Sequence, residues 1–171
     1  YVNRKTLPDM VLHNYDGDLC SHKKAHNVYG QLMTRSSYEG YQRLQPKKRP
    51  YLLTRATYSG GQRYAAVWTG DNCASWEHLQ VANIQCQRLA ISGFSFCGTD
   101  IGGFAGEPDG ELYIRWLQLA VFHPLMRTHS IGNHVSGDAL YNTENTEEFT
   151  ELPPDDIHQF GQEPWSYGEK W

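Results

Sequence analysis

Short apolar runs alternate with segments of helical periodicity along the middle of this chain. The apolar runs are "RPYLLTRA" (49–56), "RYAAVWTGD" (63–71), "ISGFSFCGTD" (91–100) and "VFHPLMRTHS" (121–130). Helical spacing of apolar residues covers residues 22–44, 76–90 and a segment that begins after Asp109. The predicted order is therefore helix, strand, strand, helix, strand, helix, strand. Helices between apolar strands are typical of α/β proteins with parallel pairing.

Helix boundaries can be placed from their capping residues. Ser21, Ser75 and Asp109 each precede a helical segment and are suited to accept a hydrogen bond from the first turn. Gln45 precedes a proline, which ends the first helix. Residues 1–21 have no clear periodicity, and we predict an irregular loop there.

Charge and cysteine usage exclude several classes of protein. A chain of 171 residues with net charge −4 fits one mildly acidic globular domain. The basic cluster "PKKRP" is too short to indicate nucleic-acid binding, and no apolar run approaches the roughly 20 residues of a membrane span. We therefore expect no nucleic-acid or membrane partner. The cysteines lack C-x-x-C or zinc spacing, so we expect buried thiols, no metal and no cofactor at Cys20, Cys73, Cys86 and Cys97.

Polar residues follow each apolar run at its C-terminal end. They are Arg55, then Asp71 and Asn72, then Thr99 and Asp100, and finally Arg127 and His129. Ligands of parallel α/β folds bind at this edge of the sheet. Strand ends are also polar simply because they reach solvent, but such a succession favours a site. Glycines beside two of the ends let the backbone approach a ligand closely.

The residue types indicate acid–base chemistry on a flat, hydroxylated ligand. Five tryptophans and eleven tyrosines offer apolar faces with polar tips, which suit sugars and other flat partners. A carboxyl group at this edge of the sheet serves as a general acid when its neighbours raise its pKa. Paired carboxyl groups about 5–5.5 Å apart hydrolyse glycosides with retention, and wider pairs with inversion. The residues alone thus favour an α/β enzyme that acts on sugars.

The string "RPYLLTRATYSGGQRYAAVWTGDNCASWEHL" resembles the catalytic barrel of family 31 glycoside hydrolases, the α-glucosidase and α-xylosidase family. The resemblance continues through "ISGFSFCGTDIGGF", "ELYIRWLQLAVFHPLMRTHS" and "EPWSYGE". It implies a (β/α)8 TIM barrel, of which residues 1–171 resemble the C-terminal half, strands five to eight. The chain is then a fragment of a larger enzyme.

The resemblance also assigns roles to individual residues. Asp71 in "WTGDN" matches the general acid/base, beside an aromatic wall whose low dielectric favours the protonated acid. Contacts with the sugar are implied for Arg63, Trp68, Asp100, Phe104 and His129. For Asp100 the alternative is to orient Arg63 or His129 without touching the sugar. Helix packing is expected for Trp76 and Trp116, and a structural role for His78 and His123. Surface or packing roles are expected for His22 and His26.

Two departures from the family pattern qualify the resemblance. The motif W-x-D-M-N-E that carries the nucleophile is absent, because "PDM" at 8–10 is followed by Val and Leu. The nucleophile is expected upstream of residue 1, in the rest of the catalytic domain, which becomes the partner of this chain. The acidic stretch at about 133–161 is an insertion of unassigned role.

These observations predict a retaining α-glycosidase, an α-glucosidase, that releases terminal α-linked glucose from oligosaccharides by double displacement. This chain carries the acid/base and not the nucleophile. A transglucosylase of the same family and a non-catalytic sugar-binding fragment remain the alternatives. The sequence leaves the cellular compartment open.

Overall fold

The computed structural model describes residues 7–131 and 162–168, which fall into two compact units. The first unit ends at Ala65, and the second begins at Ala66. The acidic stretch at about 133–161 lies outside the described residues.

The described part of the first unit contains an antiparallel hairpin, so the irregular loop predicted over residues 1–21 is wrong for residues 12–21. Strands β1 (Leu12–Tyr15) and β2 (Asp18–Ser21) pair from Leu12 opposite Ser21 to Tyr15 opposite Asp18. Asp16 and Gly17 join them, with φ angles of 51° and 99°. A two-residue turn with positive φ at both positions matches the twist of a hairpin, and Asp-Gly is suited to it. The "DG" of "YDGD" was the signal for this turn.

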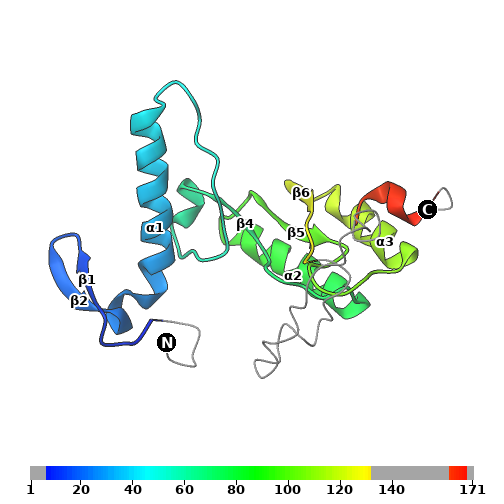
Figure 1. The fold of residues 1–171 in the computed structure, drawn as a ribbon, viewed down its shortest axis with the longest axis horizontal. Helices are drawn as coiled ribbons and strands as arrows, with labels where there is room; N and C mark the ends of the chain where they lie inside the picture. Colours follow the sequence, from blue (N-terminus) through cyan, green and yellow to red (C-terminus); the bar gives the residue numbers. More distant parts are fainter. Residues whose placement is uncertain (1–6, 132–161, 169–171) are drawn as a thin grey trace, which may run out of the picture. The chain divides into compact units, whose positions relative to one another are not determined.

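The long helix α1 (His22–Leu44) follows the hairpin directly (Figure 1). It begins after Ser21 as predicted, although the Ser21 side chain makes no capping hydrogen bond. His22 is 3% exposed and packs where the hairpin meets the helix. Its Nδ1 lies 2.9 Å from Nε2 of His13, and its Nε2 lies 3.2 Å from Nδ1 of His26. His22 therefore has a packing role, one of the two roles expected for it.

The rest of the first unit is a connection that packs against α1. It contains the short strand β3 (Leu53–Thr54) and the 3₁₀ turn η1 (Gly61–Arg63). Gly30 of α1 faces Ala56 so closely that an added Cβ would lie 2.5 Å from the Ala56 Cβ. A side chain at position 30 would therefore separate the helix from this connection.

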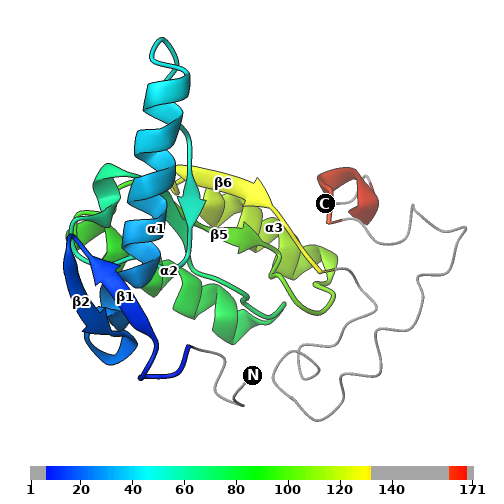
Figure 2. The ribbon, with the colours of Figure 1, turned by 60° about the vertical axis from the view of Figure 1, so that its left-hand side comes forward.

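The second unit contains a parallel sheet of β4 (Ala66–Trp68), β5 (Cys97–Ile101) and β6 (Leu125–Thr128). Helix α2 (Trp76–Ile91) connects β4 to β5, and helix α3 (Gly110–Ala120) connects β5 to β6. Both helices pack against β5 (Figure 2). A final 3₁₀ turn, η3, spans Pro164–Tyr167. The predicted alternation of strands and helices with parallel pairing is confirmed in this unit.

Side-chain caps start helices α2 and α3, as predicted. Ser75 Oγ accepts a hydrogen bond of 3.2 Å from the backbone N–H of His78. Asp109 Oδ1 accepts one of 2.7 Å from the backbone N–H of Leu112. Each cap satisfies a donor that has no partner inside its helix.

Two apolar clusters hold these helices on the sheet. One consists of Ala82, Ile101, Leu112, Tyr113, Trp116 and Ala120. The other consists of Val67, Cys86, Phe94 and Cys97. Trp116 packs as predicted, whereas Trp76 is 48% exposed, so the packing role expected for it is wrong. Trp76 is the first residue of α2, where its ring reaches beyond the core.

The cysteines are free thiols, as predicted, and the three buried ones are Cys20, Cys86 and Cys97. Over residues 7–131 and 162–168, no helix combines the length and the apolar character needed to cross a bilayer.

Candidate active site

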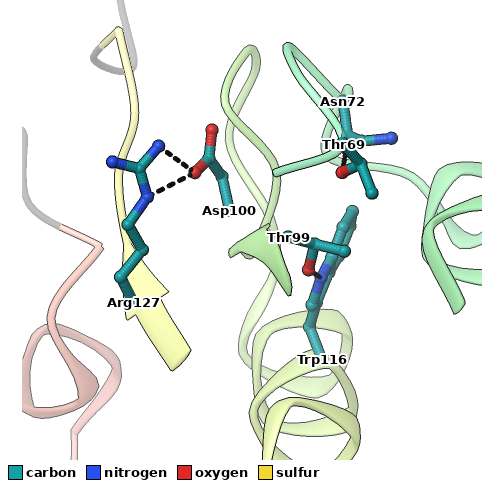
Figure 3. Close-up of polar contacts among 6 residues, drawn as sticks. All are labelled: Thr69, Asn72, Thr99, Asp100, Trp116 and Arg127. Carbon is teal, nitrogen blue, oxygen red and sulfur yellow. Dashed lines mark hydrogen bonds and ion pairs between the residues drawn. The ribbon is translucent and has the colours of Figure 1, made fainter. Parts of the chain in front are cut away.

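Strand β5 points two neighbouring polar side chains to opposite faces of the sheet, as the alternation of a strand requires. Thr99 faces helix α3, where its Oγ1 accepts a hydrogen bond of 2.8 Å from Nε1 of Trp116. Asp100 faces the other way, toward Arg127 of β6 (Figure 3). Asp100 is 0% exposed, so its carboxyl group is a buried polar group on the face opposite the helices.

Buried Asp100 and partly buried Arg127 form an ion pair across two neighbouring strands. They are register partners in the parallel ladder of β5 and β6. Nε of Arg127 donates a hydrogen bond of 3.1 Å to the carboxylate oxygen Oδ1, and Nη2 lies 2.9 Å from the same oxygen in an ion pair. Oδ2 is buried and has no hydrogen-bond partner among the residues that the structure describes. Arg127 therefore contacts only one of the two oxygens of this buried carboxyl group.

Trp68 shares this face of the sheet at the end of β4. It pairs in register with Gly98, which has the same parity along β5 as Asp100. The Arg127 guanidinium carbon lies 5.3 Å from the centre of the Trp68 ring, within the range of a cation–π contact. Arg127 thus contacts one predicted site residue on each of the other two strands.

The loop after β4 carries Asp71 and is fixed to the loop after β5. The backbone carbonyl of Asn72 accepts hydrogen bonds from the backbone N–H groups of Phe104 (2.7 Å) and Ala105 (3.1 Å). The Ala105 carbonyl accepts one in return from Ala74, at 2.8 Å. Asp71 is half-buried and lies immediately before this double connection. Its position at the C-terminal edge of the sheet is therefore set by backbone contacts.

His78 secures the same loop from the helix side. Its Nδ1 accepts a hydrogen bond of 3.0 Å from the backbone N–H of Cys73. This is a structural role, as predicted for His78.

Phe104 and His129 meet at the far end of the same edge. Their ring centroids are 5.4 Å apart, with planes tilted by 31°. The Phe104 carbonyl also accepts a hydrogen bond of 2.8 Å from the backbone N–H of Ile131. The segment after β6 is thereby tied to the loop after β5, and the exposed imidazole of His129 lies beside an aromatic ring.

Electrostatics connect these groups around Asp100. Burial raises the pKa of the Asp100 carboxyl group, and the negative charge of Asp71 raises it further. The positive charges of Arg127 and His129 oppose this shift. Two carboxyl groups, a guanidinium and an imidazole therefore interact at one edge of the sheet. Together these four side chains can donate and accept protons and can bind hydroxyl groups.

The second unit brings together most of the side chains predicted from the sequence, namely Trp68, Asp71, Asp100, Phe104 and His129. Arg63 belongs to the first unit, so its contact with this site stays a prediction. There it is exposed, its Nε donates to the Gly60 carbonyl at 3.1 Å, and its guanidinium carbon lies 5.3 Å from the centre of the Tyr64 ring.

Arg127 was given no role at the sequence level, although the polar strand ends included it. The alternative considered for Asp100, that it orients Arg63 or His129, did not include the residue with which it pairs. Within the described parts of both units, no cluster of three or more His, Cys, Asp or Glu side chains could hold a metal ion.

Comparison with known proteins identifies the fold to which this edge belongs. The family model described as the glycosyl hydrolases family 31 TIM-barrel domain matches residues 2–152. The chain belongs to glycoside hydrolase family 31. The three parallel strands with their helices are thus part of an α/β barrel, whose ligands bind at the C-terminal edge of the strands.

Two curated relatives of this family 31 chain are named as alpha-glucosidases. It is 44% identical over 168 residues to alpha-glucosidase 2 of Bacillus thermoamyloliquefaciens, covering 98% of this chain and 18% of that protein. It is 36% identical over 168 residues to mouse neutral alpha-glucosidase C, covering 96% of this chain and 16% of the relative. The chain therefore spans less than a fifth of the length of these two relatives.

Solved structures agree with this assignment. A family 31 alpha-glucosidase from Bacteroides thetaiotaomicron superposes with a TM-score of 0.66 at 37% identity, over 86% of this chain and 21% of the other. A glucosidase II alpha subunit in its Glc1Man2-bound form superposes with a TM-score of 0.67 at 38% identity, over 73% of this chain and 13% of the other.

Proposed function

We propose that this family 31 chain is part of a retaining α-glucosidase that removes terminal α-linked glucose from oligosaccharides. The observation that carries the proposal is the position of Asp71. Asp71 lies in the loop after β4, at the C-terminal edge of a parallel sheet, and its negative charge raises the pKa of Asp100. The α-glucosidase names of the relatives support glucose as the sugar.

In this proposal Asp71 is the general acid/base. It protonates the glycosidic oxygen as the leaving group departs, and it then takes a proton from the water that releases the glucosyl unit. The nucleophile of this double displacement comes from residues outside this chain, because residues 1–171 hold no W-x-D-M-N-E motif. The chain then supplies strands five to eight of the barrel, as the C-terminal half of the catalytic domain with an insertion at about 133–161.

The sugar contacts proposed for this site come from side chains with complementary properties. Trp68 and Phe104 offer aromatic faces, which suit the apolar side of a glucose ring. Asp100 can accept a hydrogen bond from a hydroxyl group, and His129 can exchange one. Arg63 is proposed as a further ligand for a hydroxyl group. The rest of the catalytic domain completes the pocket.

Replacing Asp71 by Asn in the full native protein tests the acid/base role. We expect turnover of maltose to fall by about 10²–10⁴-fold, the usual contribution of general acid–base catalysis. Aryl α-glucosides with very acidic phenols should lose less in the glucosylation step, because their leaving groups need little protonation. Glu111→Gln is the control, since this exposed carboxylate on α3 pairs only loosely with Arg115, at 3.7 Å. Equal losses on both kinds of substrate would reject Asp71 as the acid.

Product analysis separates hydrolysis from transfer. With excess maltose or isomaltose, a hydrolase releases mainly glucose, whereas dominant elongation to longer oligosaccharides would identify a transglucosylase. Sugar binding without either product would leave a binding role.

A further inference from the structure

Arg127 takes no part in the proposed reaction, although it contacts two residues of the site, Asp100 and Trp68. We propose that Arg127 is a positioning residue that fixes Asp100 and Trp68 and so determines which hydroxyl group of the glucose unit is recognised. This inference rests on the proposed function, and it adds a determinant of specificity to the same site.

The sheet register places all three side chains on one face. Arg127 is opposite Asp100, and Trp68 is opposite Gly98, two residues before Asp100 on the same strand. Strands lie about 4.8 Å apart, so β4 and β6 are separated by about 10 Å. Arg127 must therefore cross β5 to reach the Trp68 ring, and Gly98 has no side chain to obstruct that path. The contact at 5.3 Å shows that the guanidinium does cross.

The ion pair with Arg127 leaves one carboxylate oxygen of Asp100, Oδ2, without a hydrogen-bond partner among the described residues. Arginine and carboxylate often pair through two oxygens, one for each N–H group. Here Nε donates to Oδ1 and Nη2 forms an ion pair with the same oxygen, while Oδ2 is left buried without a partner among residues 7–131 and 162–168. A buried acceptor without a donor is unfavourable, and a donor that arrives with a ligand relieves this cost. We therefore assign Oδ2 to a hydroxyl group of the bound glucose.

Arginine is suited to this task in a way that lysine is not. Its planar guanidinium holds two N–H groups at a fixed angle and stacks on an aromatic face at the same time. Lysine carries the same charge on a compact ammonium group with freely rotating donors. Arg127→Lys therefore keeps the charge beside Asp100, but loses both the orientation of the carboxyl group and the flat contact with Trp68.

The proposal predicts that variants of Asp100 and Arg127 discriminate less between the parent glucoside and the glucoside that lacks one particular hydroxyl group. The full native protein should hydrolyse one of the monodeoxy α-glucosides about 10–100-fold less efficiently than the parent glucoside, because that substrate leaves Oδ2 unpaired. Asp100→Asn and Arg127→Lys should each reduce the penalty at that same position. The double variant should be little worse than Asp100→Asn alone, because Arg127 acts through Asp100.

A matched control separates positioning from a general effect of charge or folding. Arg115→Lys changes an exposed arginine on α3 in the same unit and should leave kcat/KM for every substrate unchanged. Melting temperatures of all variants are measured in parallel. For Arg127→Lys we expect kcat/KM for the parent glucoside to fall while kcat/KM for the critical deoxyglucoside stays nearly constant. A merely structural role would lower both equally.

Each outcome decides the matter. The inference is overturned if Arg127→Lys discriminates against every deoxyglucoside as strongly as the unmodified protein does. It is also overturned if Arg127→Lys loses kcat/KM equally for all deoxyglucosides and has a lower melting temperature. If Arg127→Lys does not fold, Asp100→Asn still decides, because unchanged discrimination in that variant excludes Oδ2 as the acceptor. If the unmodified protein hydrolyses no α-glucoside, the proposed function itself fails. If the unmodified protein is active and the variants discriminate between substrates as it does, only the role proposed for Arg127 is rejected.

Discussion

Trp116 and Thr99 join helix α3 to strand β5 through a hydrogen bond of 2.8 Å from the indole N–H to the threonine hydroxyl. Both residues are almost completely buried, with 0% and 1% of their surfaces exposed. Asp100 is the next residue along β5 and faces the opposite side of the sheet. The bond therefore fixes, from the helix side, the strand segment that carries Asp100 on its other face. Helix α3 and the candidate active site therefore lie on opposite faces of the same strand, β5.

Thr99→Val should destabilise the second unit by about 1–3 kcal/mol, because the isosteric change leaves a buried indole N–H without an acceptor. Urea unfolding followed by tryptophan fluorescence measures this free energy. Thr99→Ser is the matched control, since it keeps the hydroxyl group and loses only a methyl group. A larger loss of stability in Thr99→Ser than in Thr99→Val would show that the hydrogen bond is unimportant.

Gly103→Ala should reduce both stability and activity, and more strongly than Gly106→Ala. Both glycines have positive φ, 94° and 80°, which costs a residue with a Cβ roughly 1–2 kcal/mol. At Gly103 the new Cβ would also lie 2.6 Å from the Ala74 backbone nitrogen, whereas at Gly106 its nearest neighbour is the Ala74 Cβ at 3.6 Å. The overlap adds about 1–3 kcal/mol. It also pushes on the loop that carries Asp71.

Thermal unfolding and kcat/KM for an aryl α-glucoside, measured on both glycine variants, test this comparison. The proposed positioning of Asp71 predicts that Gly103→Ala loses activity even at temperatures where it is fully folded. Equal effects of the two substitutions would mean that the loop adjusts without disturbing the site.

Local patterns in the sequence predicted much of the second unit because local chemistry determines them. Ser75 and Asp109 cap their helices since a side-chain oxygen there meets backbone N–H groups of the next turn. The pairing of Asp100 with Arg127 depends on something else, the register between β5 and β6. No local pattern encodes that register, so the strand-end rule named both residues without joining them.

The hairpin was missed for a different reason. Its strands are short and largely exposed, so their apolar alternation is weak, and only the Asp16–Gly17 turn indicated it. The exposed ring of Trp76 illustrates the same limit, because helical spacing does not say how far a core extends. The relation of Arg63 to Asp71 depends on how two separate units combine.

The cysteines should differ in their reactivity toward a thiol reagent in the native protein. Burial raises the pKa of the Cys86 thiol to about 12 and also raises that of Cys97. Since the thiolate is the reactive form, both should react slowly. Cys73 is only half-buried and should be modified first. Mass spectrometry after brief alkylation identifies the order, and urea-unfolded protein, in which all cysteines should react, is the control. Rapid labelling of Cys86 in folded protein would contradict its burial.

The histidine cluster of the first unit should make its stability depend on pH. Burial is the main cause that lowers the pKa of His22, and the neighbouring His13 from β1 and His26 from α1 lower it further. The charge of Asp9 acts in the opposite direction. The unfolded chain therefore binds a proton at His22 more readily than the folded chain. Stability from this group is fully present above the unfolded pKa of about 6.5 and is lost as pH falls from there through the lowered folded pKa.

Urea unfolding of the full native protein at closely spaced pH values between about 7.5 and 5 tests this dependence on either side of the unfolded histidine pKa. Far-ultraviolet circular dichroism follows helix α1, the longest helix of the first unit. His22→Asn removes the titrating group at the centre of the cluster, so the variant should be less stable at neutral pH and have a flatter pH profile. His26→Asn removes an exposed neighbour and should flatten the profile less. A slope in His22→Asn as steep as in the parent would assign the pH dependence to groups outside this cluster.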